Sequence, residues 1–198
     1  MTVLSEPALD TSAARRAMID SQLRPSGVND PAVLARFAAL AREDFVPAAA
    51  RSVAYMDRAV PLGNGLALAP AITHGQMLVE ADLRADDRVL LVDGGTGYLA
   101  ALVKPLVGSV DVIAPEDAAK AKGGPYTLLL IDGAIETFPE GLNKVLAEDG
   151  RVVSGLVERG VTRLAVGRKA AGAVGFLTLA EADFAVLPGF TKPRKWSF

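Results

Sequence analysis

Hydrophobic positions follow two different spacings along the chain, and the change falls near residue 81. Before it, apolar residues recur every three or four positions, as on one face of a helix. After it, short unbroken apolar runs alternate with polar and glycine-rich segments, which is typical of strands buried on both faces of a parallel sheet. We therefore predict a helical cap and a loop over residues 1–80, followed by a sheet over 81–198.

Two helices are expected in the first part. One covers 10–23, with Asp10, Thr11 and Ser12 as capping candidates, and it is broken by "RPSG". The second begins with Asp30 as N-cap and a proline at the first helical position, and it ends near Pro47. Its apolar positions form one buried stripe: Val33, Leu34, Phe37, Leu40 and Ala41.

The second part reads as strand, turn and helix in alternation. The apolar runs 88–92, 109–113 and 126–131 are the expected parallel strands. The expected helices are 97–106, 115–121 and 139–150. Glycine-punctuated strands at 150–157, 161–169 and 173–187 then suggest an antiparallel end to the sheet. The predicted fold class is α/β, doubly wound and mostly parallel.

Composition limits what this fold can do. About half of the 198 residues are apolar, which suits one domain, 1–198, with its own core. The formal net charge is -2 and the cations are dispersed, so we expect no nucleic-acid partner. No run approaches the roughly 18 apolar residues of a membrane helix, and the start lacks a signal-peptide pattern. We expect a soluble, cytoplasmic protein.

Few residues offer acid, base or metal chemistry. The chain has no cysteine, which excludes disulfides, thiolate metal sites and a cysteine nucleophile. His74 is the single histidine, and we expect it to be a hydrogen-bonded structural residue rather than part of a triad or a metal site. We therefore predict no metal.

The segment "VLLVDGGTGYLAA" (89–101) joins a predicted strand to a helix through a glycine cluster. Ligands of doubly wound sheets lie at the carboxyl ends of the strands, so this turn is the predicted ligand site. Gly95, Gly97 and Ala100 satisfy a relaxed dinucleotide pattern, with Glu116 about 20 residues further on for a ribose. A tight turn without a ligand remains an alternative.

Longer stretches of the sequence help to decide which ligand the glycine turn would bind. The segment 15–63 contains "RPSGVND", "AREDFVP" and "AYMDRAVPLG" in order, and "VLLVDGGTGYLAALV", "PYTLLLIDGAIETFPEGLNKVLAEDGRVV" and "VLPGFTKP" follow. Together they resemble the protein-L-isoaspartate O-methyltransferase family, especially its bacterial members. The resemblance implies a Rossmann-like methyltransferase fold, S-adenosylmethionine as cofactor, and isoaspartyl carboxylates of damaged proteins or peptides as substrates. Methyl transfer to a carboxylate depends mainly on aligning the carboxylate, the methyl group and the leaving sulfur and on excluding water.

The resemblance also assigns candidate site residues. The cofactor set is Asp93, Gly94, Gly95, Gly97, Tyr98, Glu116 and Asp132. For Asp132, which is expected to end its strand at the ligand edge, capping of the following loop is an equal alternative. The family's "GQTIS" loop, whose hydroxyls lie at the isoaspartyl site, corresponds to "GLALA" here, so Ala67 and Ala69 replace both hydroxyl residues.

The cofactor motif departs from the family pattern at several points. Leu91 stands at the position of the family's acidic residue, and Asp93 at that of its first glycine. Ala114 takes the place of the ribose-binding acid, with Glu116 two residues later. About one helix-strand unit is missing before "PYTLLLID", so the expected fold is a shortened version of the family's. Aspartate tolerates positive φ, so we expect the turn to form.

Three hypotheses remain open on the sequence: a methyltransferase of this family, a non-catalytic binding or regulatory module on the same fold, and an unrelated dinucleotide-binding protein. Asp93 would either pair with the cofactor's ammonium group or repel its carboxylate, and we expect net weakening. In the last segment, Glu136 is expected in solvent, and Trp196 and Phe198 are expected to pack back onto the domain.

Overall fold

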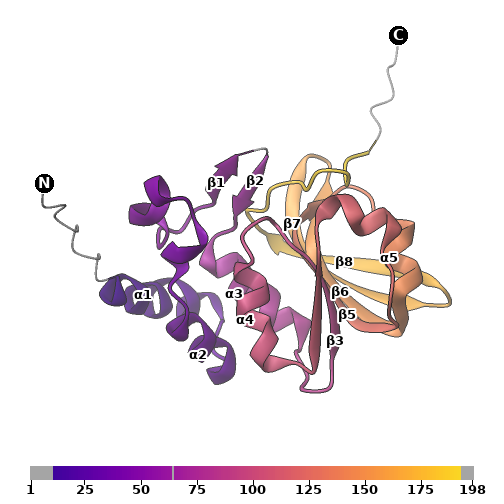
Figure 1. Cartoon of the computed structure of the whole chain (residues 1–198), viewed down its shortest axis with the longest axis horizontal. Coiled ribbons are helices and arrows are strands. Elements are labelled where there is room, and N and C mark those ends of the chain that lie inside the picture. The colour runs from indigo at the N-terminus through magenta and orange to yellow at the C-terminus, as the bar shows by residue number, and fades with distance from the viewer. Residues whose placement is uncertain (1–10, 64, 193–198) are drawn as a thin grey trace, which may run out of the picture.

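A six-stranded sheet forms the centre of the computed structural model, which describes residues 11–63 and 65–192 (Figure 1). The strand order is β4-β3-β5-β6-β7-β8. The first four strands of this order are parallel, and β7 and β8 follow in antiparallel orientation. The bounds are β3 Arg88–Val92, β4 Ser109–Ile113, β5 Tyr126–Ile135, β6 Leu146–Glu158, β7 Val161–Ala170 and β8 Ala173–Glu181. The predicted fold class, with its antiparallel end, is confirmed.

Layers of side chains on the two faces of the sheet explain why its central strands are unbroken apolar runs. On β3, Val89 and Leu91 face one core cluster, and Leu90 and Val92 face the other. All four are at most 1% exposed. The first cluster packs against α3 Ala71–Ala81 and α4 Tyr98–Val103, and the second against α5 Glu140–Val145, which lies on the other side of the sheet (Figure 1).

The N-terminal part packs outside α3 and α4 as the predicted helical cap. It contains α1 Ser12–Met18, a π-helical turn over Ile19–Leu23 and α2 Pro31–Ala39. Asp30 caps α2 as expected, because its carboxylate accepts hydrogen bonds from the amides of Ala32 (2.8 Å) and Val33 (3.0 Å). Thr11 makes no capping bond and instead donates to Glu43, while Asp10 lies outside the described residues. Three short 3-10 turns complete the cap: Arg24–Ser26, Arg42–Phe45 and Ala48–Val53.

Several predicted segments are corrected. α2 ends at Ala39 and not near Pro47, because Leu40 has an extended backbone. The helix expected over 115–121 is a 3-10 turn, and the last strand ends at Glu181 and not at residue 187. The helix expected over 139–150 ends at Val145, because Lys169 donates hydrogen bonds to the carbonyls of Asn143 (2.7 Å) and Leu146 (2.8 Å), where β6 begins. The loop expected before α3 instead forms a separate hairpin of β1 Val60–Gly63 and β2 Leu66–Leu68.

The β4 edge agrees with the predicted shortening. From Ile113 the chain passes through a 3-10 turn, Pro115–Lys120, and then enters β5, so within the described residues β4 is an edge strand of the sheet. Among residues 11–63 and 65–192, no helix is both long enough and apolar enough to cross a bilayer.

Candidate functional site

The glycine turn lies where the sequence predicts it, at the carboxyl end of β3. The last residue of this strand, Val92, is paired with Ile113 of β4 and Ile131 of β5, and the turn leads directly into α4. Gly95 and Gly97 adopt left-handed conformations, with φ of +100° and +71°. Asp93 does not have a positive φ, so the two glycines, and not its tolerance of that conformation, allow the turn to form.

The carboxylate of Asp93 binds the turn's own amides. Its Oδ2 accepts a hydrogen bond from the amide of Gly95 at 3.0 Å, and its Oδ1 accepts one from the amide of Gly97 at 2.9 Å. Burial, followed by the nearby charge of Asp132, raises the pKa of Asp93, while the two amides and His74 act in the opposite direction. The acid therefore serves as an internal ligand of the turn.

Asp132 and His74 form a buried pair behind this turn. Asp132 follows Ile131 in β5, where the register with β6 shifts, and it is 4% exposed. Its Oδ1 lies 2.7 Å from Nε2 of His74, which comes from α3 and is fully buried. A Cβ atom on Gly94 would stand 2.4 Å from the carbonyl oxygen of Asp132, so this approach requires glycine.

His74 thus belongs to the site, although the sequence suggested only a structural role. It is hydrogen-bonded, as expected, but its partner is one of the predicted cofactor residues. Nothing in its own neighbourhood in the sequence indicates this, because Asp132 lies 58 positions further along the chain.

Tyr98 points into the core beneath the turn. Its ring packs against Phe45, with centroids 5.0 Å apart, and against His74 at 5.7 Å. The side chain is fully buried, and burial raises its pKa to about 12. Tyr98 therefore ties the turn to the helical cap.

Arg42 is the second residue that sequence reasoning missed. Its guanidinium lies 5.0 Å from the centroid of the Tyr98 ring and is fully buried. Nε donates to the carbonyl of Ala54 at 2.7 Å, and Nη2 donates to the carbonyl of Ala69. Burial lowers its pKa. Arg42 thus connects the cap, the turn and the end of the hairpin.

The β1–β2 hairpin covers part of the glycine turn. A Cδ1 atom of Leu66 lies 2.9 Å from the place of a Cβ on Gly95, and one of Leu62 lies 3.8 Å from it. Ala67 on β2 is half-buried, and Ala69, just after that strand, is 4% exposed. The hairpin therefore places the side chains of Leu62 and Leu66 beside the turn. The positions where the family resemblance implies hydroxyl groups, Ala67 and Ala69, follow Leu66 in the chain.

Glu116 lies in the 3-10 turn that follows β4, and its side chain is exposed. Ala114 immediately precedes this turn, so the last position of the β4 segment carries no acid. Glu136, expected in solvent, is partly exposed and accepts an exposed hydrogen bond from the amide of Lys192 at 2.6 Å. The predicted packing of Trp196 and Phe198 lies outside the described residues.

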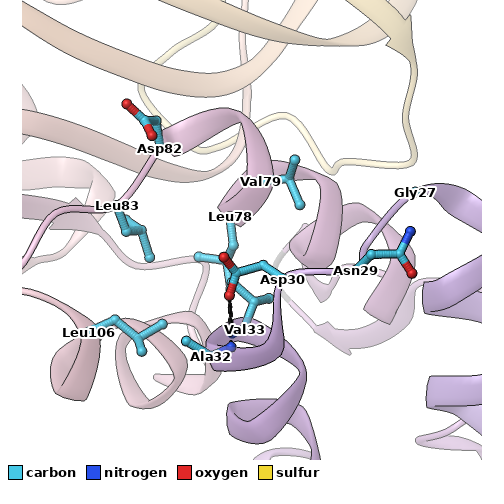
Figure 2. A pocket seen from close by; sticks show the side chains of 10 residues that line it. All are labelled: Gly27, Asn29, Asp30, Ala32, Val33, Leu78, Val79, Asp82, Leu83 and Leu106. Atoms are coloured by element: carbon cyan, nitrogen blue, oxygen red, sulfur yellow. Dashed lines mark hydrogen bonds between the residues drawn. The ribbon is translucent and has the colours of Figure 1, made fainter.

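A well-formed cavity of about 270 Å³ lies away from the glycine turn (Figure 2). Its lining includes Leu83 and Leu106, which precede β3 and β4, so it opens near the amino ends of the strands. Figure 2 shows Asp30 at its centre, engaged in capping α2. The glycine turn lies at the opposite end of β3, together with Asp93 and Tyr98, whose pKa values are raised, and we place the candidate site there.

Comparison with known proteins agrees with the resemblance. The family model for protein-L-isoaspartate(D-aspartate) O-methyltransferase matches residues 13–121. A protein-L-isoaspartate O-methyltransferase of Koribacter versatilis is 32% identical, over 93% of this chain and 96% of its own length. The chain belongs to the protein-L-isoaspartate O-methyltransferase family. A second family member, from Methylorubrum extorquens, is 33% identical over 75% of this chain and 76% of its own.

Solved structures share the fold. A Plasmodium falciparum protein of this name, in complex with S-adenosyl-L-homocysteine, superposes with a TM-score of 0.68 at 16% identity, covering 89% of this chain and 97% of its own. Another protein-L-isoaspartate O-methyltransferase gives a TM-score of 0.73 at 18% identity, covering 88% and 66%.

The family uses S-adenosylmethionine, and the turn of this member fits that cofactor only in its backbone path. The amides of Gly95 and Gly97 already bind Asp93, and Leu66 packs on Gly95. The residues present therefore do not fit a ligand whose anionic end needs these amides. Among the described residues, no group of three metal-ligating side chains is found.

Proposed function

We propose that this member of the protein-L-isoaspartate O-methyltransferase family is a non-catalytic binding or regulatory module. The observation that carries the proposal is the apolar hairpin beside the glycine turn, with Ala67 and Ala69 where the family resemblance implies hydroxyl donors. The methyl side chains of these alanines donate no hydrogen bond that could hold a carboxylate against the methyl donor.

The energetic loss supports this proposal. Each missing hydrogen bond weakens the hold on a substrate by about 1 kcal/mol, and by more when the group bound is charged. Two such losses reduce occupancy of the reactive arrangement by well over tenfold. Because methyl transfer to a carboxylate depends on alignment, loss of the aligning groups removes most of the catalysis.

The second candidate is an active methyltransferase that transfers the methyl group of S-adenosylmethionine to isoaspartyl carboxylates of cytoplasmic proteins. It is favoured by the left-handed Gly95 and Gly97, which keep the backbone path of a nucleotide-binding turn. The alanines and the internally bound amides weigh against it.

Calorimetry followed by a transfer assay separates the two. We expect S-adenosylhomocysteine to bind weakly or not at all at millimolar concentration, with NADH as the control for a dinucleotide site. We also expect no transfer of radiolabelled methyl groups to an isoaspartyl peptide under conditions in which the Koribacter versatilis relative is active. Transfer at a rate comparable to that relative would refute the non-catalytic proposal.

The variant Ala67→Thr/Ala69→Ser sharpens the test. If missing hydroxyls are the main loss, this variant gains measurable transfer, and the matched variant Ala48→Thr/Ala49→Ser, on exposed positions of the cap, does not. No gain in the first variant would show that the hairpin does not decide activity.

A further inference from the structure

Two backbone amides of the turn after β3 already have a hydrogen-bond partner within the turn. Backbone amides of a glycine turn at a strand end commonly bind an anionic group of a ligand. Here the amides of Gly95 and Gly97 each donate to a different oxygen of Asp93, at 3.0 Å and 2.9 Å. An incoming anion can reach these donors only after the carboxylate of Asp93 has left them.

The charges around Asp93 add to this barrier. The charge of Asp132 on β5 acts on Asp93 and raises its pKa, and the charge of His74 on α3 acts in the opposite direction. His74 is bonded to Asp132 rather than to Asp93. The one buried guanidinium in contact with Tyr98, that of Arg42, is directed to the carbonyls of Ala54 and Ala69. An anion arriving at the turn therefore meets two carboxylates and no free cation from these elements.

We propose that Asp93 determines the charge of the ligand at this turn, excluding carboxylate, phosphate and pyrophosphate groups and admitting neutral or cationic ones. The inference deepens the proposed function, because it concerns the ligand of the same turn. It also separates this turn from a dinucleotide site, since a pyrophosphate would need the amides that Asp93 holds.

The physical basis is the sign of the interaction. An anion brought beside Asp93 and Asp132 is repelled in a partly buried environment, where charges are poorly screened. A cation at the same place is attracted and leaves the two amide bonds intact. The raised pKa of Asp93 accords with this, because it shows that negative charge is already disfavoured there.

Three adenosyl compounds of different charge test the inference by calorimetry. S-adenosylhomocysteine carries an ammonium and a carboxylate, methylthioadenosine carries neither, and decarboxylated S-adenosylmethionine carries only positive charge. On the unmodified chain we expect the decarboxylated compound to bind at least about tenfold more tightly than S-adenosylhomocysteine, because a hydrogen-bonded charge is worth that much or more.

Substitution of Asp93 should reverse this order. Asp93→Gly frees both amides, and we expect it to tighten S-adenosylhomocysteine about tenfold and to weaken the decarboxylated compound. Asp93→Asn, which keeps the shape and removes the charge, should fall between the two. Asp86→Asn, an exposed acid before β3, is the matched control and should leave all three affinities unchanged.

The outcomes distinguish this inference from the proposed function. An unchanged ratio of the two charged compounds in Asp93→Gly, with the fold intact by circular dichroism, would overturn the role of Asp93 even if the chain transfers no methyl groups. Failure of all three compounds to bind Asp93→Gly would overturn it too, while leaving the non-catalytic proposal in place. Methyl transfer by the unmodified chain would overturn that proposal and not the charge preference.

Discussion

Two aspartates flank β3 and have opposite environments. Asp87, just before the strand, accepts hydrogen bonds from Thr127 (2.7 Å) and from Arg151 (2.6 Å), and also from the amide of Arg84 (2.8 Å). The carboxylate of Asp93, just after the strand, accepts hydrogen bonds from amides of its own turn and lies within the electrostatic influence of Asp132. One carboxylate has a cation as its partner, and the other has a second carboxylate nearby.

The pKa values follow this difference. Burial alone would raise the pKa of Asp87, but the hydrogen bonds from Arg151 and Thr127 outweigh it and hold the pKa below its usual range. At Asp93, burial and Asp132 together prevail over the two amides, and the pKa rises. The amino end of the strand is therefore arranged for stability, and the carboxyl end keeps an electrostatic conflict of the kind that functional sites retain.

The largest expected effect is loss of the partner at the amino end. Asp87→Ala removes the buried carboxylate at Nη2 of Arg151 and leaves that side chain, 17% exposed, with the exposed carboxylate of Asp82 at 3.7 Å, so we expect the free energy of unfolding to fall by about 3 kcal/mol. Urea unfolding measures this. Asp86→Ala, at the exposed neighbouring position, should change stability by less than about 0.5 kcal/mol. Equal losses of unfolding free energy in the two variants would contradict the difference in stability that we infer between the two ends of β3.

A steric change tests the carboxyl end. Gly94→Ala places a methyl group 2.4 Å from the carbonyl oxygen of Asp132, so we expect a loss of about 2 kcal/mol and displacement of the turn. Gly175→Ala is the matched control, because its added methyl group meets nothing within 4 Å and its stability should change by less than about 0.5 kcal/mol. A tolerated Gly94→Ala would mean that the turn does not pack on Asp132.

A smaller loss of stability is expected at the N-cap of α2, which lies near the amino ends of β3 and β4. Asp30→Ala removes two hydrogen bonds to the first turn of the helix, and we expect about 1 kcal/mol of destabilisation in thermal or urea unfolding. Asp30→Asn keeps an acceptor and should recover most of it. If the two variants were equally unstable, the carboxylate charge and not the cap would be responsible.

The smallest effect, a dependence on pH, distinguishes the two aspartates by sign. Asp87, with a lowered pKa, contributes stability above the unfolded value of about 3.9, and this contribution is lost as the pH falls through the folded value. Asp93, with a raised pKa, disfavours the folded state once ionised, and this penalty disappears as the pH falls from the raised pKa towards about 3.9.

Urea unfolding of the unmodified chain and of Asp93→Asn, repeated across this pH range, measures the contribution of Asp93 to stability. The stability of Asp93→Asn relative to the unmodified chain should increase as the pH rises from about 4 through the raised pKa and should then level off. A constant difference at every pH would show that Asp93 does not titrate differently in the folded state.

The sequence predicts the strands at the centre of the sheet better than any other part. β3 begins and ends at the expected residues, because its unbroken apolar run leaves little choice. β4 also keeps its predicted bounds, but as an edge strand it is largely exposed and not buried on both faces as expected. The early end of α5 depends on Lys169, a residue on β7, so no local pattern could reveal it. The hairpin was missed because its two short strands pair only with each other.

The candidate site, too, could be predicted only in part from the sequence. The turn and the position of Asp132 follow from the strand ends, and the exchange of glycine for Asp93 is visible in the motif. What Asp93 binds, and the presence of His74 and Arg42 at the site, depend on contacts between distant segments. Short-range patterns therefore locate the site, and tertiary contacts decide its charge.

The bond from Arg42 to Ala69 has a mechanical consequence. It fixes the end of the hairpin to a buried guanidinium that is itself held by the carbonyl of Ala54, so that end cannot move without breaking the buried hydrogen bond from Arg42 to Ala69. A ligand that approaches Gly95 from the side of the hairpin must therefore displace the side chain of Leu66, whose Cδ1 lies 2.9 Å from the place of a Cβ on Gly95.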